Sequence, residues 1–121
     1  MKYTELEVWK EARALVKTIY DITQKFPASE KFGLTSQIQR AAISIPSNIA
    51  EGCGREGKKD SIRFFYIARG SLYELETQLY LSFDLNYLNP LELEVGLSTL
   101  QQVRKLLSGF IKYYESSIVN N

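Results

Sequence analysis

Residues 36–55, SQIQRAAISIPSNIAEGCGR, decide the fold of this chain. Polar residues in this stretch recur at spacings of four and three, which places them on one face of a helix; they are Arg40, Ser44, Asn48, Glu51 and Arg55. Apolar residues supply the opposing face; they are Leu34, Ile38, Ala41, Ile45 and Ile49. We expect this helix to begin near Thr35 or Ser36 and to fade at 52–57. Pro46 removes one backbone hydrogen bond inside the helix and should bend its axis.

A first helix precedes this stretch. Thr4 is expected to be its N-cap, because Glu7 three residues later can complete a capping box. Apolar residues then alternate at four and three, a seam typical of helices that pack at a shallow angle; they are Val8, Ala12, Leu15, Ile19, Ile22 and Phe26. Pro27 stops the helix, and residues 28–33 form the connection to the next one.

Two further helices complete the chain. The third is expected from about Lys58 to Leu85, and residues 86–89 form a short turn. The fourth opens with Asn89 as its cap, Pro90 at its first position and Glu92 at its third. Its apolar residues are Leu93, Leu97, Leu100, Val103, Leu107, Ile111 and Tyr114. Because short connections favour antiparallel neighbours, the sequence predicts an all-α, antiparallel up-down-up-down four-helix bundle in a single domain, residues 1–121.

Several segments, in this order, resemble the four-helix-bundle family named after proteins encoded in intervening sequences of bacterial 23S ribosomal RNA genes. They are LEVWKEA at 6–12, FPASEKFGLTSQIQRAA at 26–42, SIPSNIAEG at 44–52, IARGS at 67–71 and ELETQL at 74–79. The resemblance covers nearly the whole chain. The same fold includes the accessory protein of diversity-generating retroelements, a pentameric, basic partner of a reverse transcriptase that binds nucleic acid. The resemblance therefore implies a homo-oligomer, and specifically a pentamer.

The residue types that the chain lacks narrow the range of reactions and metal sites that it could support. It contains no histidine, so it lacks the usual general base at neutral pH and the commonest transition-metal ligand. Its one cysteine, Cys53, has no second cysteine with which to form a zinc site or a redox pair. Neither a P-loop nor a dinucleotide-binding glycine motif is present. We expect no enzyme, no catalytic residue, no cofactor and no metal site, and we interpret Cys53 as a small packing residue rather than a reactive thiol.

The expected compartment is the cytoplasm. No run approaches the roughly 18 apolar residues of a membrane span. The opening residues, MKYTELEVWK, lack the apolar core of a signal peptide. A single cysteine agrees with a reducing compartment. We therefore expect no membrane partner.

The third helix carries a second stripe beside its core-facing one. The core-facing stripe is Phe65, Ala68, Leu72, Leu75 and Leu79. Half of the eight tyrosines recur every seven residues next to it; they are Tyr66, Tyr73, Tyr80 and Tyr87. Since a monomeric bundle needs one buried face per helix, the second stripe predicts a contact with another subunit. Two alternatives are that the tyrosines border the core with their hydroxyls in water, and that they stack on nucleic-acid bases.

The polar face of the second helix has two interpretations. Arg40 and Arg55 either contact phosphates or pair with acids such as Glu51 and Glu74 in a network between helices or subunits. Small residues let another backbone approach this face and favour the network; they are Ser44, Ser47, Ala50 and Gly52. The residues predicted for an oligomer interface or polar network are Arg40, Asn48, Glu51, Tyr66, Arg69, Tyr73, Glu74 and Tyr80.

Positive charge gathers around the turn between the second and third helices. The formal net charge is only +1, but residues 1–70 hold twelve Lys and Arg against eight acids, and residues 71–121 hold three against six. Four cations lie within nine residues, offset by Glu56 and Asp60; they are Arg55, Lys58, Lys59 and Arg63. A ring of subunits would repeat this patch around one axis as a nucleic-acid-binding rim, whereas in a monomer it is ordinary solvated surface. The near-neutral charge departs from the basic retroelement protein.

Two functions from different classes follow from these observations. The first is a non-enzymatic, homo-oligomeric helical-bundle adaptor or scaffold whose further partner is another protein. The second is an RNA- or DNA-binding accessory factor that uses the basic turn repeated around the oligomer.

Overall fold

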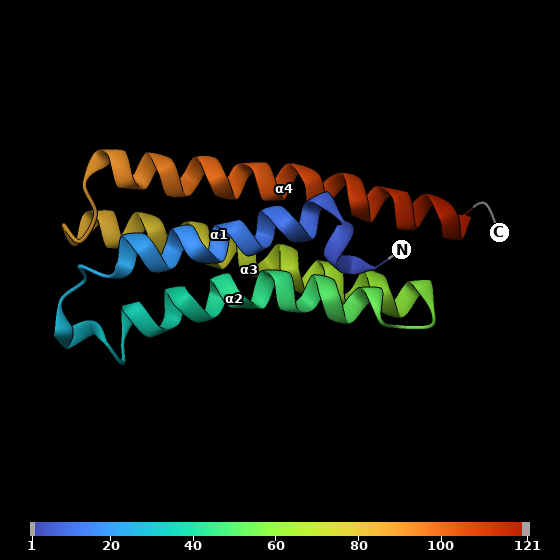
Figure 1. Ribbon diagram of the computed structural model, residues 1–121, viewed down its shortest axis with the longest axis horizontal. Coiled ribbons are helices and arrows are strands. Elements are labelled where there is room, and N and C mark those ends of the chain that lie inside the picture. The colour runs from blue at the N-terminus through green and yellow to red at the C-terminus, as the bar shows by residue number, and fades with distance from the viewer. Residues whose placement is uncertain (1, 120–121) are drawn as a thin grey trace.

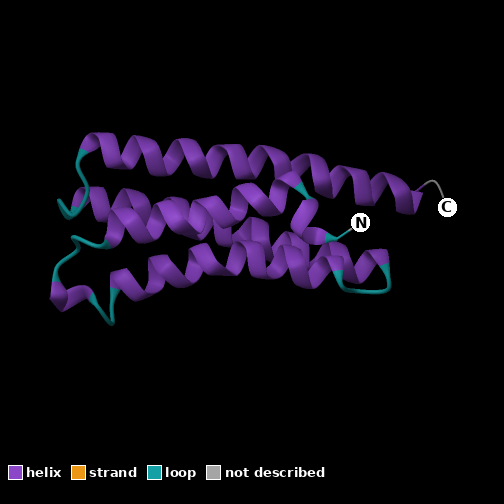
Figure 2. Ribbon diagram, in the orientation of Figure 1, coloured by secondary structure: helices purple, strands orange, loops and turns teal. Residues whose placement is uncertain are grey.

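The computed structural model describes residues 2–119, and over this range it contains helices and turns but no strand (Figure 2). The four long helices are α1 Glu7–Thr23, α2 Leu34–Cys53, α3 Lys58–Asp84 and α4 Pro90–Val119. Two short 3-10 helices are η1 Tyr3–Glu5 and η2 Ala28–Glu30. The predicted all-α class is confirmed, and the predicted bounds of α2 and α3 agree with the structure to within a few residues.

The helices lie side by side along the long axis of the molecule (Figure 1). Each helix contacts the one before and after it in the chain, and α4 returns to α1; within residues 2–119 the diagonal pairs make no backbone contact. In Figure 1, η1, the α2–α3 turn and the end of α4 lie at one end of the bundle. The α1–α2 and α3–α4 connections lie at the other. This arrangement is the predicted up-down-up-down bundle.

The core is built from one apolar stripe on each helix. Its largest fully buried side chains are Leu15, Ile19, Ile38, Ile45, Ile49, Phe65, Leu72, Leu75, Leu79, Leu100, Val103 and Leu107. All of them belong to the stripes that periodicity predicts. Burial of each such side chain contributes about 1.5–3 kcal/mol relative to exposure, so the packed stripes account for the association of the four helices.

The start of α1 differs from the prediction. Thr4 lies in η1, and α1 begins after Leu6, an extended residue that offers no side-chain cap. Glu7 is therefore the first residue of α1, and the predicted Thr4–Glu7 capping box was wrong. Instead the rings of Tyr3 and Trp9 pack edge to face with centroids 5.3 Å apart, which holds the short 3-10 turn against α1.

The predicted start of α4 is confirmed in detail. The Glu92 N–H donates to Oδ1 of Asn89 at 2.8 Å, and the Asn89 N–H donates to Oε1 of Glu92 at 2.9 Å. These reciprocal bonds form a capping box, with Pro90 at the first helical position. Glu92 also forms an ion pair with Lys25, which ties the end of α1 to the start of α4.

The end of α3 corrects the predicted tyrosine stripe. The helix stops at Asp84, and Asn86 adopts a left-handed conformation with φ 65°. Tyr87 therefore lies in the turn and does not continue the helical row. Its ring packs on Phe26 with centroids 5.3 Å apart, and its hydroxyl donates to Oε2 of Glu30 at 2.8 Å. Tyr87 joins the two connections at this end of the bundle.

Candidate functional site

Three tyrosines form an exposed row on α3, which we call the tyrosine face: Tyr66, Tyr73 and Tyr80. Their exposed fractions are 37%, 54% and 49%. The seven-residue spacing is close to two helical turns, so the rings follow one another along the helix. Contacts of Tyr66 and Tyr73 with α4 side chains place these two rings on the side of α3 next to α4.

Tyr66 is held from two sides. The Arg69 guanidinium lies 4.4 Å from the centre of its ring, a cation–π contact one helical turn away. The Tyr66 hydroxyl donates a hydrogen bond to Glu115 on α4. This hydrogen bond raises the pKa of the Tyr66 phenol, because the neutral form is the one that donates. The ring is therefore fixed in orientation while part of it faces solvent.

Tyr73 is supported by a polar cluster between α3 and α4. The Arg104 guanidinium lies 4.6 Å from the centre of its ring. Nη2 of Arg104 also bonds Oε1 of Glu76 at 2.9 Å, and Gln101 bonds both groups at 3.2 Å. The Arg104 and Glu76 side chains are only 21% and 22% exposed. This pair could not be predicted from the sequence, because an acid and a base on different helices leave no periodic signal.

Neutral side chains form polar contacts at α2 and α3, around Asn48 of the predicted network. Oγ of Ser44 and Oγ of Ser71 share a hydrogen bond at 2.8 Å. The Asn48 amide donates to the Ser44 carbonyl at 2.8 Å and to its hydroxyl at 2.9 Å. The first bond joins α2 to α3, and the two Asn48 bonds lie within α2 and support Ser44.

The charged residues predicted for that network are not brought together. Glu51 reaches Arg55 only at 3.9 Å. Arg40 and Glu74 are both exposed, and neither forms an ion pair with another described residue. Their charged groups are accessible to a molecule outside this chain.

The two arginines of the basic turn share the same two partners, Asp60 and Phe64. Arg63 bonds Oδ1 of Asp60 at 2.9 Å, and Nε of Arg55 lies 3.7 Å from Oδ2 of the same carboxylate. Both guanidinium groups also lie over the Phe64 ring, at 4.5 Å for Arg55 and 4.7 Å for Arg63. Asp60 therefore partly neutralises the two arginines while Phe64 fixes their position.

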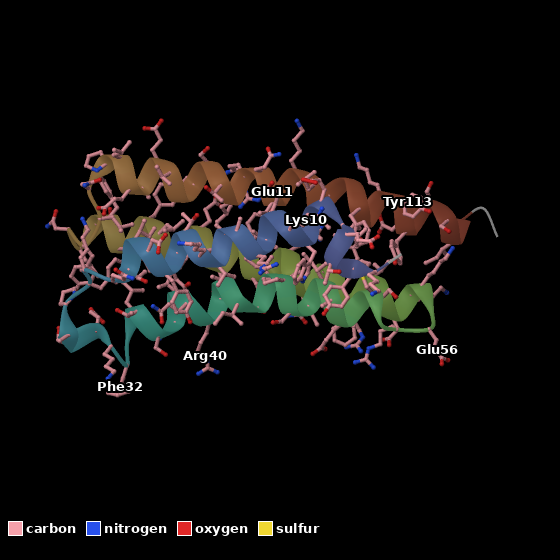
Figure 3. The ribbon with its side chains drawn as sticks, viewed as in Figure 1. Lys10, Glu11, Phe32, Arg40, Glu56 and Tyr113 are labelled. Atoms are coloured by element: carbon pink, nitrogen blue, oxygen red, sulfur yellow. The ribbon has the colours of Figure 1, made fainter. Side chains whose placement is uncertain are left out.

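The two lysines of the turn are placed differently. Both are exposed, but Lys58 donates to the Ser117 hydroxyl on α4 and Lys59 does not. A cavity of about 270 Å³ lies between this turn and α4, lined by residues that include Arg55, Lys58, Glu56 and Tyr113. Figure 3 shows Glu56 and Tyr113 toward the same end of the bundle. Of the four predicted basic residues, Arg55 and Lys58 therefore line this cavity together with the Glu56 carboxylate, whereas Lys59 and Arg63 do not line it.

Cys53 lies half-buried at the end of α2. Burial raises the pKa of its thiol, which keeps the sulfur protonated and weakly nucleophilic. Over residues 2–119 there is no group of three or more Cys, Asp or Glu side chains that could hold a metal ion. No described helix combines the length and apolarity needed to cross a membrane.

The fold and these surfaces define a class of small four-helix-bundle proteins. The model of the 23S rRNA-intervening sequence protein family matches residues 4–109, and the chain belongs to that family. The resemblance of its sequence segments is thereby confirmed. No curated protein matches the chain significantly.

A solved structure supports the same fold. A crystal structure from Bacteroides thetaiotaomicron, described as a protein of unknown function from the S23 ribosomal protein family, is similar with a TM-score of 0.80. The sequences are 24% identical, and the match covers 87% of this chain and 98% of that chain. At this identity the likeness bears on the fold alone.

Proposed function

We propose that this protein is a non-enzymatic, cytoplasmic scaffold or adaptor that assembles into a homo-oligomer through its tyrosine face. The pentameric state is taken from the resemblance to the retroelement accessory protein. The observation that carries the proposal is the partial exposure of Tyr66, Tyr73 and Tyr80 on a helix whose other face already fills the core. Aromatic rings with one apolar face and one polar group suit a subunit contact.

The way the rings are held strengthens this proposal. Arg69 and Glu115 fix Tyr66, and Arg104 fixes Tyr73. Side chains that are ordered before docking lose little conformational entropy when a partner covers them. Tyrosine and arginine are also the residue types that most often dominate interface energies. The exposed charge of Glu74 offers a further contact to a neighbouring subunit.

A comparison of native masses tests the tyrosine face. The variant Tyr73→Glu/Tyr80→Glu is expected to have a smaller native mass than the wild-type protein, with far-UV circular dichroism nearly unchanged. The matched control is Tyr113→Glu, because Tyr113 is 71% exposed but lies on α4 outside the tyrosine face. The control should keep the wild-type mass. A double variant with unchanged mass, or a control that dissociates equally, would contradict the proposal.

The second candidate function, nucleic-acid binding, is favoured by the gathering of Arg55 and Lys58 around the cavity beside Tyr113. Fluorescence anisotropy of labelled structured RNA and duplex DNA at several salt concentrations tests it. Phosphate contacts on duplex DNA give a log–log salt slope of about −0.9 each. Lys58→Gln/Lys59→Gln should weaken binding and flatten that slope, whereas Lys10→Gln/Lys112→Gln on other helices should not. Absence of binding at low salt would leave the scaffold proposal alone.

A further inference from the structure

A second cavity lies at the opposite end of the bundle from the basic turn. It is bounded by the last turns of α1, the α1–α2 connection and the first turns of α2. Its volume is about 630 Å³, within the roughly 300–1,000 Å³ of small-molecule sites. The proposed scaffold function makes no use of this cavity.

The charged side chains that line this cavity are all cations. They are Lys31 and Arg40, and no carboxylate lines it. Neither cation forms an ion pair with another residue in the described range. The basic turn differs, since Asp60 there bonds Arg63 and approaches Arg55. The net positive charge at this cavity is therefore available to a ligand.

The first turn of α2 adds to this preference for an anion. Thr35 lines the cavity, and its Oγ1 is buried with no hydrogen-bond partner in the described structure. Thr35 also lies in the first turn of α2, where the helix dipole favours negative charge.

One wall of the cavity is apolar and open. Phe26, Pro27 and Phe32 contribute to it, and Phe32 is 90% exposed. The Lys31 ammonium lies 5.5 Å from the centre of the Phe32 ring. Figure 3 shows Phe32 and Arg40 projecting from the same side of the molecule. A ligand that carries both an anionic and an apolar group would find a partner for each here.

We propose that this cavity binds a small organic anion, in which an oxyanion group is joined to an aromatic or apolar body. Arg40 and Lys31 contact the oxyanion at the rim, and Phe32 covers the body. Phosphate and carboxylate share the chemistry that these cations recognise, so the probes distinguish the two.

The test is isothermal titration calorimetry of the wild-type protein with phenyl phosphate and, separately, with benzoate. Saturable binding of at least one probe is expected, with a Kd of about 1 mM or lower. A preference for phenyl phosphate assigns the site to phosphorylated ligands, and a preference for benzoate assigns it to carboxylates. Arg40→Gln and Lys31→Gln should each weaken binding about tenfold. Lys105→Gln, which removes one exposed cation from α4, is the matched control and should bind like the wild-type protein.

Three results would overturn the proposal. The first is that neither probe binds saturably. The second is that Lys105→Gln weakens binding as much as Arg40→Gln, which would indicate general charge attraction. The third is that Arg40→Gln alters the native mass while leaving probe affinity unchanged, which would assign Arg40 to a subunit contact. Arg40 and Lys31 are exposed, so neither substitution should prevent folding.

Discussion

The ring of Phe65 on α3 lies directly against the backbone of Gly52 on α2. A Cβ atom at position 52 would lie 2.8 Å from Cδ1 of Phe65 and 2.9 Å from the carbonyl oxygen of Ser61. Because the second contact is with the α3 backbone, rotating a side chain cannot relieve the clash. The close approach of α2 and α3 at this end of the bundle therefore depends on glycine.

We predict that Gly52→Ala lowers the free energy of unfolding by about 1–3 kcal/mol, because overpacking forces the two helices apart. Urea denaturation measures the change. The matched control is Gly70→Ala in the interior of α3, where an added Cβ has no neighbour within 4 Å. That control should gain about 0.5–1 kcal/mol from better helix propensity. Equal stability of Gly52→Ala and the wild-type protein would show that the contact is not restrictive.

Two carboxylates at helix starts should make stability depend on pH. Glu30 accepts the Leu34 N–H at 3.1 Å, and Glu92 accepts the Asn89 N–H at 2.9 Å. These backbone hydrogen bonds lower the pKa of both carboxyls below the ordinary 4.5. A depressed folded pKa contributes stability that is present above the unfolded pKa and is lost as pH falls through the folded pKa. The contribution is therefore present at neutral pH and declines below about pH 4.5.

We predict that Glu30→Gln/Glu92→Gln is less stable than the wild-type protein at pH 7. The difference should shrink as the pH is lowered below about 4.5, because the wild-type carboxylates then become protonated. Thermal unfolding at a series of pH values measures both stabilities. The control is Glu94→Gln, because Glu94 is an exposed acid near the start of α4. Its stability should follow the wild-type pH curve. A difference that stays constant across this pH range would refute the linkage.

The Glu76–Arg104 pair should couple stability to assembly. A double-mutant cycle with Glu76→Gln and Arg104→Gln is expected to give a coupling energy of about 0.5–1 kcal/mol, since the pair is partly shielded from solvent. Arg104→Gln should also dissociate the oligomer at a higher protein concentration, because Tyr73 loses the guanidinium stacked on its ring. Light scattering on dilution measures this. Lys105→Gln, its exposed neighbour, should change neither quantity.

Replacing Pro46 tests whether the backbone geometry that this proline imposes on α2 is needed for oligomer assembly. Proline lacks the N–H that would bond the Ala42 carbonyl, so Pro46→Ala restores one hydrogen bond in α2. We predict a gain of about 1–3 kcal/mol in the free energy of unfolding. A wild-type native mass would mean that the proline is only tolerated. A reduced mass would mean that the backbone geometry it imposes positions the subunit contact.

The four helices could be predicted because each carries a complete local signal. The apolar seam from Val8 to Ile22 is periodic, although Phe26, which was expected to continue it, lies beyond the end of α1 at Thr23. Asn89 with Glu92 has the spacing that a capping box requires. The start of α1 could not be predicted in the same way. There the packing of Tyr3 on Trp9 outweighs a capping box that the sequence also permits.

The candidate sites were predictable only in part. Periodicity places Tyr66 and Tyr73 on one side of α3, but their partners come from α4, and Glu115 is 49 residues from Tyr66. Local patterns carry no information about such distant pairs. The cavity beside Arg40 is equally hidden, because its shape is set by how the chain passes from α1 into α2.

The topology gives the bundle a chemical polarity along its axis. One end carries η1, the basic turn and the last turns of α4, and the other carries the cavity lined by Lys31 and Arg40. The 27 residues of α3 separate these ends by about 40 Å. If subunits pack side by side in the same orientation, the resulting ring has two unlike rims. A macromolecule held at one rim and a small anion held at the other would then occupy the assembly together without touching.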